Sequence, residues 1–250
     1  MFLDQLRATQ LRFQQLKKLS MMRINRMNSK EQRDLENTLP DEISRDDCKL
    51  ELINISCIKA ECELFSSIDA ELQPGDNLQI EGINGSGKTT LLRIICGLTF
   101  PESGEIRWNG ASIHKDRQSY NEDLVYVGHA HGIKPQLTPI ENLKIEQEFS
   151  TMDDSMTIEE ILDRVGLFQF RDHSCSTLSA GQCRRIALAR LLMRRGRLWI
   201  LDEPCSNLDH SGFDLVGELI SSHLARGGIS IFVSHQPIPI SSHHARAIRL

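Results

Sequence analysis

One short stretch of the sequence has the residue types and spacing of a loop that binds phosphate groups. It follows the pattern G-x-x-x-x-G-K-[ST] and consists of Gly82, Ile83, Asn84, Gly85, Ser86, Gly87, Lys88, Thr89 and Thr90. In such a loop the backbone N–H groups point inward around an anion, and the lysine adds a full positive charge. We therefore expect residues 82–90 to hold the polyphosphate of a nucleotide, with the Thr89 hydroxyl on the accompanying Mg²⁺. The alternative is a chance glycine-rich turn before a helix.

Two carboxylates follow an apolar run later in the chain. Asp202 and Glu203 come directly after Leu-Trp-Ile-Leu at residues 198–201. If that run is a strand of a parallel sheet, its carboxyl end lies beside the bound nucleotide. We expect Asp202 to hold Mg²⁺ through water as a hard oxygen ligand, and Glu203 to orient and deprotonate the attacking water.

The residues on either side of the loop predict the elements that position it. Residues 77–81 alternate polar and apolar side chains after a Pro-Gly turn, which indicates a strand. After the loop, apolar side chains recur at helical spacing at Leu91, Leu92, Ile95 and Leu98. A strand therefore leads into the loop, and the loop opens a helix whose N-terminus adds partial positive charge to the phosphate site.

Further patterns predict an α/β protein with a mostly parallel sheet. Short runs that are alternating or continuously apolar predict strands at 67–72, 105–110, 124–127, 198–201 and 229–233, the second of them closing on an Asn-Gly hairpin turn. Two capping boxes, at Thr138 and Thr157, begin helices within residues 133–195. Another helix is predicted at 213–224. Buried strands that alternate with helices are typical of a parallel sheet.

The composition is that of an ordinary globular protein. The chain has 250 residues, of which 40% are hydrophobic and 25% charged. No run of about eighteen apolar residues occurs in the sequence, so any membrane role must come through a partner. The chain has a net charge of −5, and this negative charge argues against nucleic acid as a partner. The seven cysteines lack metal-binding spacing, and we expect reduced thiols.

The first 47 residues differ in composition from the rest. Residues 1–30 carry seven basic side chains and the single acid Asp4, whereas residues 31–47 carry seven acids and two arginines. The basic part predicts an amphipathic segment for an anionic membrane surface or an organelle-targeting extension. The alternatives are a solvated, partly disordered tail and a stretch upstream of the true start codon at Met21, Met22 or Met27. The acidic part has the composition of a linker. We expect residues 1–47 to be an extension that need not be ordered.

Three more motifs lie in order around the two carboxylates. Residues 178–182 read Leu-Ser-Ala-Gly-Gln, residues 206–209 read Ser-Asn-Leu-Asp, and His235 follows the last apolar run. Together with the phosphate loop, these motifs closely resemble the signature, the D-loop and the switch histidine of the ATP-binding-cassette superfamily. The resemblance begins at about Leu50 and ends at about Pro237.

This resemblance implies a fold, a ligand and a second subunit. Cassette domains are P-loop NTPases with a mostly parallel core sheet, an antiparallel β subdomain and a helical insert, here expected within 48–250 with the insert at about 133–195. Two domains pack head to tail and bind ATP and Mg²⁺ between them. Ser179 and Gly181 would contact the γ-phosphate of the partner subunit's ATP. The residues on the other side of each ATP would be Lys88, Thr89, Asp202, Glu203 and His235, with catalytic roles for Glu203, His235 and Lys88.

A narrower resemblance lies at residues 126–134, which read Tyr-Val-Gly-His-Ala-His-Gly-Ile-Lys. This string is similar to the ATP-binding subunits of haem exporters for cytochrome c maturation. Most cassettes have glutamine where His129 stands, and an imidazole there can hydrogen-bond water or touch the metal. An exposed loop histidine is the alternative. The family pattern has Gln-Pro at the positions of Ala130 and His131, so the segment that couples hydrolysis to the membrane partner differs here.

The resemblance also implies partners and a location. It indicates an ATP-hydrolysing subunit that binds integral membrane transporter subunits, and a haem chaperone beyond them, at the cytoplasmic face of the inner membrane or the matrix side of the mitochondrial inner membrane. Hydrolysis would drive haem export or release a haem-loaded chaperone. The alternatives are a transporter ATPase for another cargo and a soluble cassette protein that acts on ribosomes or DNA.

Several large side chains are expected to have structural roles only. No aromatic residue stands near Lys59, where many cassettes stack adenine, and we expect Phe65, Trp108 and Trp199 to pack in the core. The arginines that follow the signature are expected to form a solvated helix face; they are Arg184, Arg185, Arg190, Arg194 and Arg195.

Overall fold

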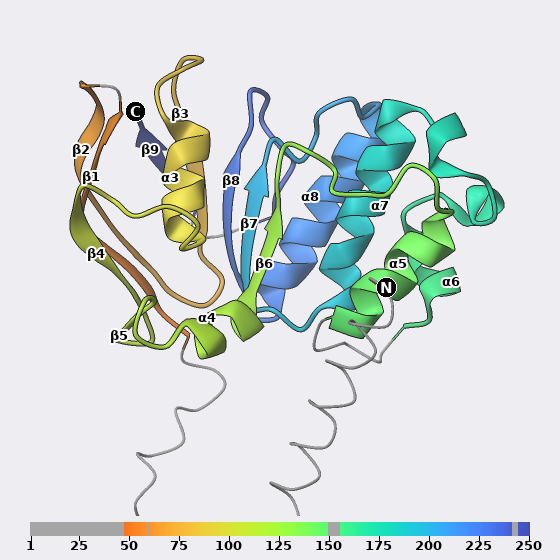
Figure 1. The fold of residues 1–250 in the computed structure, drawn as a ribbon, viewed down its shortest axis with the longest axis horizontal. Helices are drawn as coiled ribbons and strands as arrows, with labels where there is room; N and C mark the ends of the chain where they lie inside the picture. The colour runs from red at the N-terminus through yellow and green to blue at the C-terminus, as the bar shows by residue number, and fades with distance from the viewer. Residues whose placement is uncertain (1–47, 60, 150–155, 242–244) are drawn as a thin grey trace, which may run out of the picture. The chain divides into compact units, whose positions relative to one another are not determined.

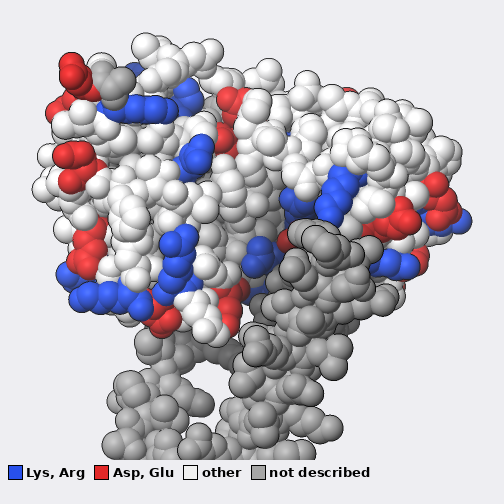
Figure 2. All heavy atoms as spheres, in the orientation of Figure 1, with Lys and Arg blue, Asp and Glu red and all other residues white. Residues whose placement is uncertain are grey.

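The computed structural model describes residues 48–59, 61–149, 156–241 and 245–250. The extension predicted at 1–47 lies outside these residues. Two sheets and the helices beside them make up the described part of the chain (Figure 1). None of the described helices combines the length and the apolar character that crossing a membrane requires. On the face drawn in Figure 2, acidic and basic side chains are interspersed among wide uncharged areas.

Among the described residues, one sheet has five strands, all parallel, in the order β6-β7-β8-β3-β9. Their bounds are Asn77–Glu81 for β3, Leu124–Val127 for β6, Leu198–Asp202 for β7, Ile229–Val233 for β8 and Ala245–Arg249 for β9. The first four confirm predicted strands, and β9 has no predicted counterpart. Every residue of β7 and β8 is buried, which fits continuously apolar strands covered on both faces.

The second sheet is antiparallel, with the order β2-β1-β4-β5 in the described residues. Its strands are β1 (Leu50–Lys59), β2 (Cys62–Leu72), β4 (Ser103–Trp108) and β5 (Ala111–Ser112). Asn109 and Gly110, with φ angles of 52° and 77°, form the predicted hairpin turn between β4 and β5. The two sheets confirm the expected fold class, a P-loop NTPase domain with a parallel core and an antiparallel β part.

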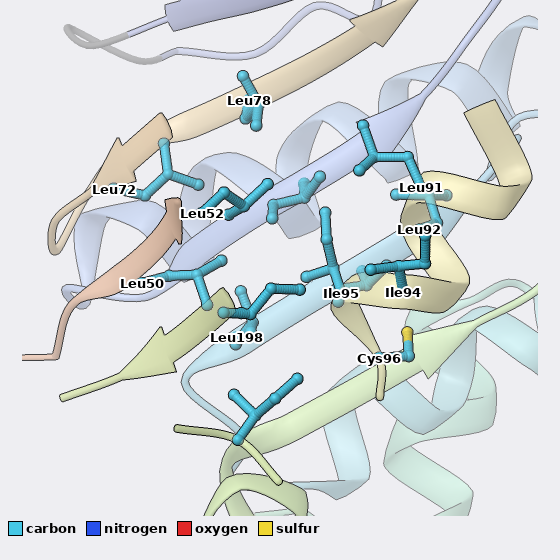
Figure 3. Packing of buried hydrophobic residues seen from close by; sticks show 14 of the residues in the cluster. Leu50, Leu52, Leu72, Leu78, Leu91, Leu92, Ile94, Ile95, Cys96 and Leu198 are labelled. Atoms are coloured by element: carbon cyan, nitrogen blue, oxygen red, sulfur yellow. The ribbon is translucent and has the colours of Figure 1, made fainter. Parts of the chain in front are cut away.

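The two faces of the parallel sheet belong to different hydrophobic clusters. Leu198 and Ile200 of β7 lie in a cluster with helix α3 (Lys88–Ile95) and the antiparallel sheet, and Figure 3 shows part of this packing. Trp199 and Leu201, which alternate with them, lie in a cluster with α7 (Ala180–Met193) and α8 (His210–Ala225). Alternate side chains of a strand point to opposite faces, so each helix layer covers one face.

Helix α3 is shorter than the sequence pattern predicts. It ends at Ile95, and Gly97, two residues later, adopts a φ of 68°. Leu98 lies beyond this turn and is 54% exposed, so its assignment to the apolar face of the helix is wrong. The cause is the glycine, because a left-handed residue ends a helix.

Between β6 and β7 the described chain is mainly helical. The helices are α5 (Pro139–Phe149), α6 (Ile158–Arg164) and α7, and a short helix α4 (Arg117–Asp123) precedes β6. Both predicted capping boxes are present: Thr138 exchanges hydrogen bonds with Glu141, and Thr157 with Glu160. These caps fix where α5 and α6 begin. The division of the chain into an extension, a core and a helical insert stays a prediction.

Candidate nucleotide site

The predicted phosphate loop connects β3 to α3, and its glycines meet three different requirements. A Cβ on Gly82 would lie 2.5 Å from Ser86 Oγ, and one on Gly87 would lie 3.1 Å from the ring of Phe65. Gly85, by contrast, has no described atom within 4 Å of where its Cβ would be. All three have φ angles between 88° and 151°. The loop is therefore packed against the protein on one side and open at Gly85, as a phosphate cradle must be.

Lys88 extends back across the loop. Its Nζ atom donates to the carbonyl oxygens of Gly82 at 2.7 Å and Ile83 at 2.8 Å, and the residue is only 8% exposed. Together with Asn84 and Thr90, Lys88 lines a pocket of about 300 Å³. The ammonium group is thus held inside the curve of the loop, where its charge reaches any anion bound there.

Asp202 is the last residue of β7 and faces the start of α3. Its Oδ1 atom lies 3.4 Å from the Thr89 hydroxyl, and the residue is 1% exposed. Its Oδ2 atom is buried and has no hydrogen-bond partner among the described residues. Burial raises the pKa of Asp202, and the Thr89 hydroxyl acts in the opposite direction. A hydroxyl beside a carboxylate with an unused oxygen suits a hard divalent cation such as Mg²⁺.

Glu203 lies between two histidines. Its Oε1 atom is 3.2 Å from His235 Nε2, and its Oε2 atom is 3.7 Å from His129 Nδ1. Glu203 follows β7, His235 follows β8 and His129 follows β6. These strands are parallel neighbours, so their carboxyl ends bring the three residues to one edge of the sheet. Glu203 also has a left-handed backbone, with φ at 51°. The contact between His129 and Glu203 has no counterpart in the sequence patterns.

The signature residues lie at the start of α7. Ser179 is the N-cap and exchanges hydrogen bonds with Gln182, and it is exposed. Gly181 packs so tightly that a Cβ would lie 2.5 Å from the carbonyl oxygen of Asn207. Ser179 and Gly181 line a pocket of about 500 Å³ that shares no lining residue with the pocket at Lys88. Within one chain, the structure does not bring the signature to the phosphate loop.

The prediction of a solvated arginine face after the signature is wrong for Arg184. Its side chain is fully buried and donates to four backbone carbonyl oxygens. They belong to Gly128 (2.7 Å), Asp202 (2.8 Å), Glu203 (2.8 Å) and Pro204 (3.1 Å). The physical reason is that the chain leaves the sheet here and needs other donors for its carbonyls. A signal was present, because position 184 is on the same helical face as the apolar residues 187, 188 and 191.

Two more of these arginines are only partly exposed. Arg185 pairs with Asp209 at 2.9 Å and donates to the Val165 carbonyl, and its side chain is 17% exposed. Arg190 donates to Gly132 O at 2.7 Å and pairs with Glu146 at 3.4 Å. Both tie α7 to neighbouring segments, so this face of the helix is not simply solvated.

The fold and the site together define a phosphate-loop NTPase domain of the ATP-binding-cassette type. The sequence family described as ABC transporter matches residues 65–206 of the chain. The chain belongs to this family.

Individual relatives agree with this assignment. The chain is 46% identical over 197 residues to the cytochrome c biogenesis ATP-binding export protein CcmA of Sodalis glossinidius, a match that covers 79% of this chain and 93% of the relative. It is 44% identical over 196 residues to the protein of the same name from Haemophilus influenzae, covering 78% and 92%. Among solved structures, an ABC transporter ATP-binding protein from Pyrococcus furiosus has a TM-score of 0.67 at 24% identity, covering 80% of this chain and 96% of that one. That likeness shows the shared fold.

Proposed function

We propose that this chain is the ATP-hydrolysing subunit of a membrane export complex that serves c-type cytochrome biogenesis. The observation that carries the catalytic part is the position of Glu203 between His129 and His235, beside Asp202 at the edge of the sheet. The relatives support the biological part, because their names state cytochrome c biogenesis and ATP-binding export, and the chain spans 93% and 92% of their length.

In this proposal residues 82–90 and Lys88 hold the phosphates of ATP, and the Lys88 ammonium turns from the loop carbonyls to phosphate oxygens. Thr89 and Asp202 hold Mg²⁺, with His129 as a further group beside it. When bound there, the ion neutralises charge that develops on the phosphate oxygens.

Glu203 and His235 act at the γ-phosphate, and Glu203 lines the same pocket as Lys88 and Thr89. Glu203 orients a water molecule and takes its proton as the water oxygen attacks the γ-phosphorus, while the bond to the leaving oxygen of ADP breaks. The neighbouring His235 ring fixes the direction of the carboxylate by its contact with Oε1. Most of the catalysis in such a reaction comes from positioned charge, and these residues supply it.

A second copy of the chain completes the site. Ser179 and Gly181 line a pocket of their own, away from Lys88, so they serve the γ-phosphate of ATP held by the other copy. The exposed start of α7, with its N–H groups, suits an anion that arrives from outside the chain. One structural relative at 24% identity is described as a dimeric ATP-binding cassette in a post-hydrolysis state with ADP and phosphate bound, and its dimer supports this arrangement.

The export complex also needs membrane-spanning subunits. The chain binds such subunits peripherally, at the cytoplasmic face of the inner membrane or at the matrix side of the mitochondrial inner membrane. In this proposal, residues 129–131 couple hydrolysis to these membrane subunits. The segment connects His129, which contacts Glu203, to the exposed loop before α5. The cargo is haem or a haem-loaded chaperone.

Cells that lack the endogenous protein provide the test. Wild-type chain should restore covalently haem-loaded c-type cytochromes, detected by haem staining, and Lys88→Ala should not. Membrane subunits should co-purify with both. Normal cytochrome levels with Lys88→Ala, or with no chain at all, would exclude this function, and membrane partners of an importer would indicate another cargo.

A further inference from the structure

Arg184 is a buried charge to which the reaction above assigns no role. It lies in the helical turn that follows Gly181, and its side chain is 0% exposed. A buried guanidinium loses its water and is retained only where other groups satisfy its donors. Here the acceptors are backbone carbonyls from two separate segments of the chain.

The first segment contains the two carboxylates. The Nη2 atom donates to the carbonyls of both Asp202 and Glu203 at 2.8 Å, and Nε donates to Pro204 at 3.1 Å. The Glu203 carbonyl accepts a second hydrogen bond from Ser206 N at 3.0 Å. Because Glu203 has a left-handed backbone, which a side chain with a Cβ disfavours, these bonds hold a turn that would otherwise relax.

The second segment carries His129. The Nη1 atom of Arg184 donates to the Gly128 carbonyl at 2.7 Å, one residue before the histidine that contacts Glu203 Oε2. One planar guanidinium therefore holds the backbone of Glu203 and also the backbone of Gly128, next to His129. Moving α7 without moving both segments would break several of these hydrogen bonds at once.

The start of the same helix carries the signature residues. Gly181 lies against the Asn207 carbonyl, in the segment that continues from Pro204, so the first turn of α7 has a second rigid contact with the chain after β7. No side chain separates the two backbones there, because a Cβ would not fit. A short path of packed contacts therefore connects Ser179 to the Glu203 turn.

We propose that Arg184 is a positioning residue that couples the signature end of α7 to Glu203. ATP that one copy holds against Ser179 and Gly181 of the other copy then sets the geometry for hydrolysis at Glu203 of that other copy. This inference rests on the proposed function, since it requires a second copy that presents ATP to the signature. With this coupling, hydrolysis depends cooperatively on the ATP concentration, because the two sites of the dimer depend on each other through the two Arg184 side chains.

Lysine cannot replace arginine in this role. An ammonium group presents its donors from a single atom, whereas the guanidinium presents five N–H groups in a fixed plane. Arg184→Lys therefore keeps the positive charge and loses the fork that joins residue 128 to residues 202–204. Arg190→Lys is the matched control, because Arg190 lies on the same helix and also donates to a loop carbonyl, that of Gly132.

The test measures Mg-ATP hydrolysis by the full chain with its co-purified membrane subunits, over a range of ATP concentrations. For Arg184→Lys we expect the half-saturating ATP concentration to stay near the wild-type value, kcat to fall about 100-fold through misplacement of Glu203, and the Hill coefficient to fall to 1. Arg190→Lys should keep the wild-type Hill coefficient. Arg184→Met, which fills the volume without charge, should behave like Arg184→Lys and serves if the lysine variant is unstable.

A wild-type Hill coefficient of 1 would overturn the inference, as would an unchanged Hill coefficient in folded Arg184→Lys or Arg184→Met. A loss of kcat that merely follows the fraction of folded protein, measured by thermal unfolding, would do the same. Glu203→Gln separates this inference from the proposed function. If Glu203→Gln is inactive while the Arg184 variants behave as wild type, only the inference fails, and if Glu203→Gln is active, the catalytic part of the proposed function fails.

Discussion

His235 Nε2 lies 3.2 Å from Glu203 Oε1, and the register of two neighbouring strands sets this distance. Asp202 pairs with Val233 in the parallel ladder of β7 and β8, and Glu203 N donates to the Val233 carbonyl just beyond it. Glu203 and His235 thus follow the carboxyl ends of neighbouring strands, at the same edge of the sheet. The carboxylate lies in the first residue after β7 and is tied by its backbone to the end of β8, which favours a fixed catalytic geometry.

Glu203→Gln should abolish hydrolysis while ATP binding continues. Glutamine keeps the size of the side chain but cannot accept the proton of the attacking water, and a general base contributes at least about 100-fold to rate. We expect kcat to fall by that factor and the ATP-bound dimer to accumulate, as measured by phosphate release and by size-exclusion chromatography with ATP.

The control for this change is Glu218→Gln. Glu218 is 66% exposed and pairs only loosely with Arg164, at 3.8 Å. Loss of the same charge there should leave both hydrolysis and dimerisation unchanged. Equal rates for Glu203→Gln and Glu218→Gln would contradict the assignment of Glu203 as the base.

Lys88→Ala should weaken nucleotide binding more than any other single change in the loop. The variant removes the one full positive charge held within the loop and leaves the Gly82 and Ile83 carbonyls without that donor. Charge-assisted contacts of this kind contribute about 1.5–3 kcal/mol each, which is roughly a tenfold to 150-fold loss in affinity. Calorimetric titration with Mg-ATP measures the loss, and Lys115→Ala, at an exposed lysine outside the pocket, should bind normally.

The sequence predicted most of the strands and the chemistry at their ends, because both depend on local signals. Runs such as residues 198–201 and 229–233 are too apolar for a surface, and the loop pattern at 82–90 is specific. The parallel sheet was predicted but the strand order was not, and it is the adjacency of β6, β7 and β8 that places His129, Glu203 and His235 together. Their roles in hydrolysis remain predictions.

The features that escaped prediction depend on tertiary contacts. Arg184 looked like one of several surface arginines, since sequence alone does not show which carbonyls the chain leaves unpaired after β7. Strand β9 carries Arg246 and Arg249 and lacks a strong apolar signal, yet it pairs with β3 at the edge of the sheet. Helix α3 ended early because the conformation of Gly97 overrode the apolar periodicity that reached Leu98.

Alanine substitutions at two loop glycines should separate folding from ligand binding. The added Cβ of Gly85→Ala has no described atom within 4 Å, so the variant should lose only the backbone cost of a positive φ, about 1–2 kcal/mol, while still obstructing the phosphates. Gly87→Ala pays the same backbone cost and also crowds the Phe65 ring at 3.1 Å. Without nucleotide, thermal unfolding should therefore show a larger loss for Gly87→Ala. Equal losses of stability for the two variants would mean that the Phe65 ring moves aside at no measurable cost.

His223 is packed where a charge cannot be accommodated. Its ring stacks on Trp199 with centroids 3.9 Å apart, and a Cβ on Gly228 would lie 2.2 Å from it. Burial lowers its pKa to about 4, an effect that the hydrogen bond to the Ile229 carbonyl opposes and that Arg226 reinforces. The folded protein therefore keeps this histidine neutral in a pH range where the unfolded chain protonates it, because an unperturbed histidine has a pKa of about 6.5.

The unfolding free energy should consequently fall as the pH is lowered from about 6.5 to about 4, since the unfolded state binds the additional proton. The full loss from this group corresponds to about 3 kcal/mol and is complete below the folded-state pKa. His223→Gln, which stays neutral and can still donate to the Ile229 carbonyl, should flatten this part of the pH profile in urea unfolding. His210→Gln, at the exposed first residue of α8, should leave the slope unchanged. Parallel profiles for wild type and His223→Gln would show that the proton is taken up elsewhere.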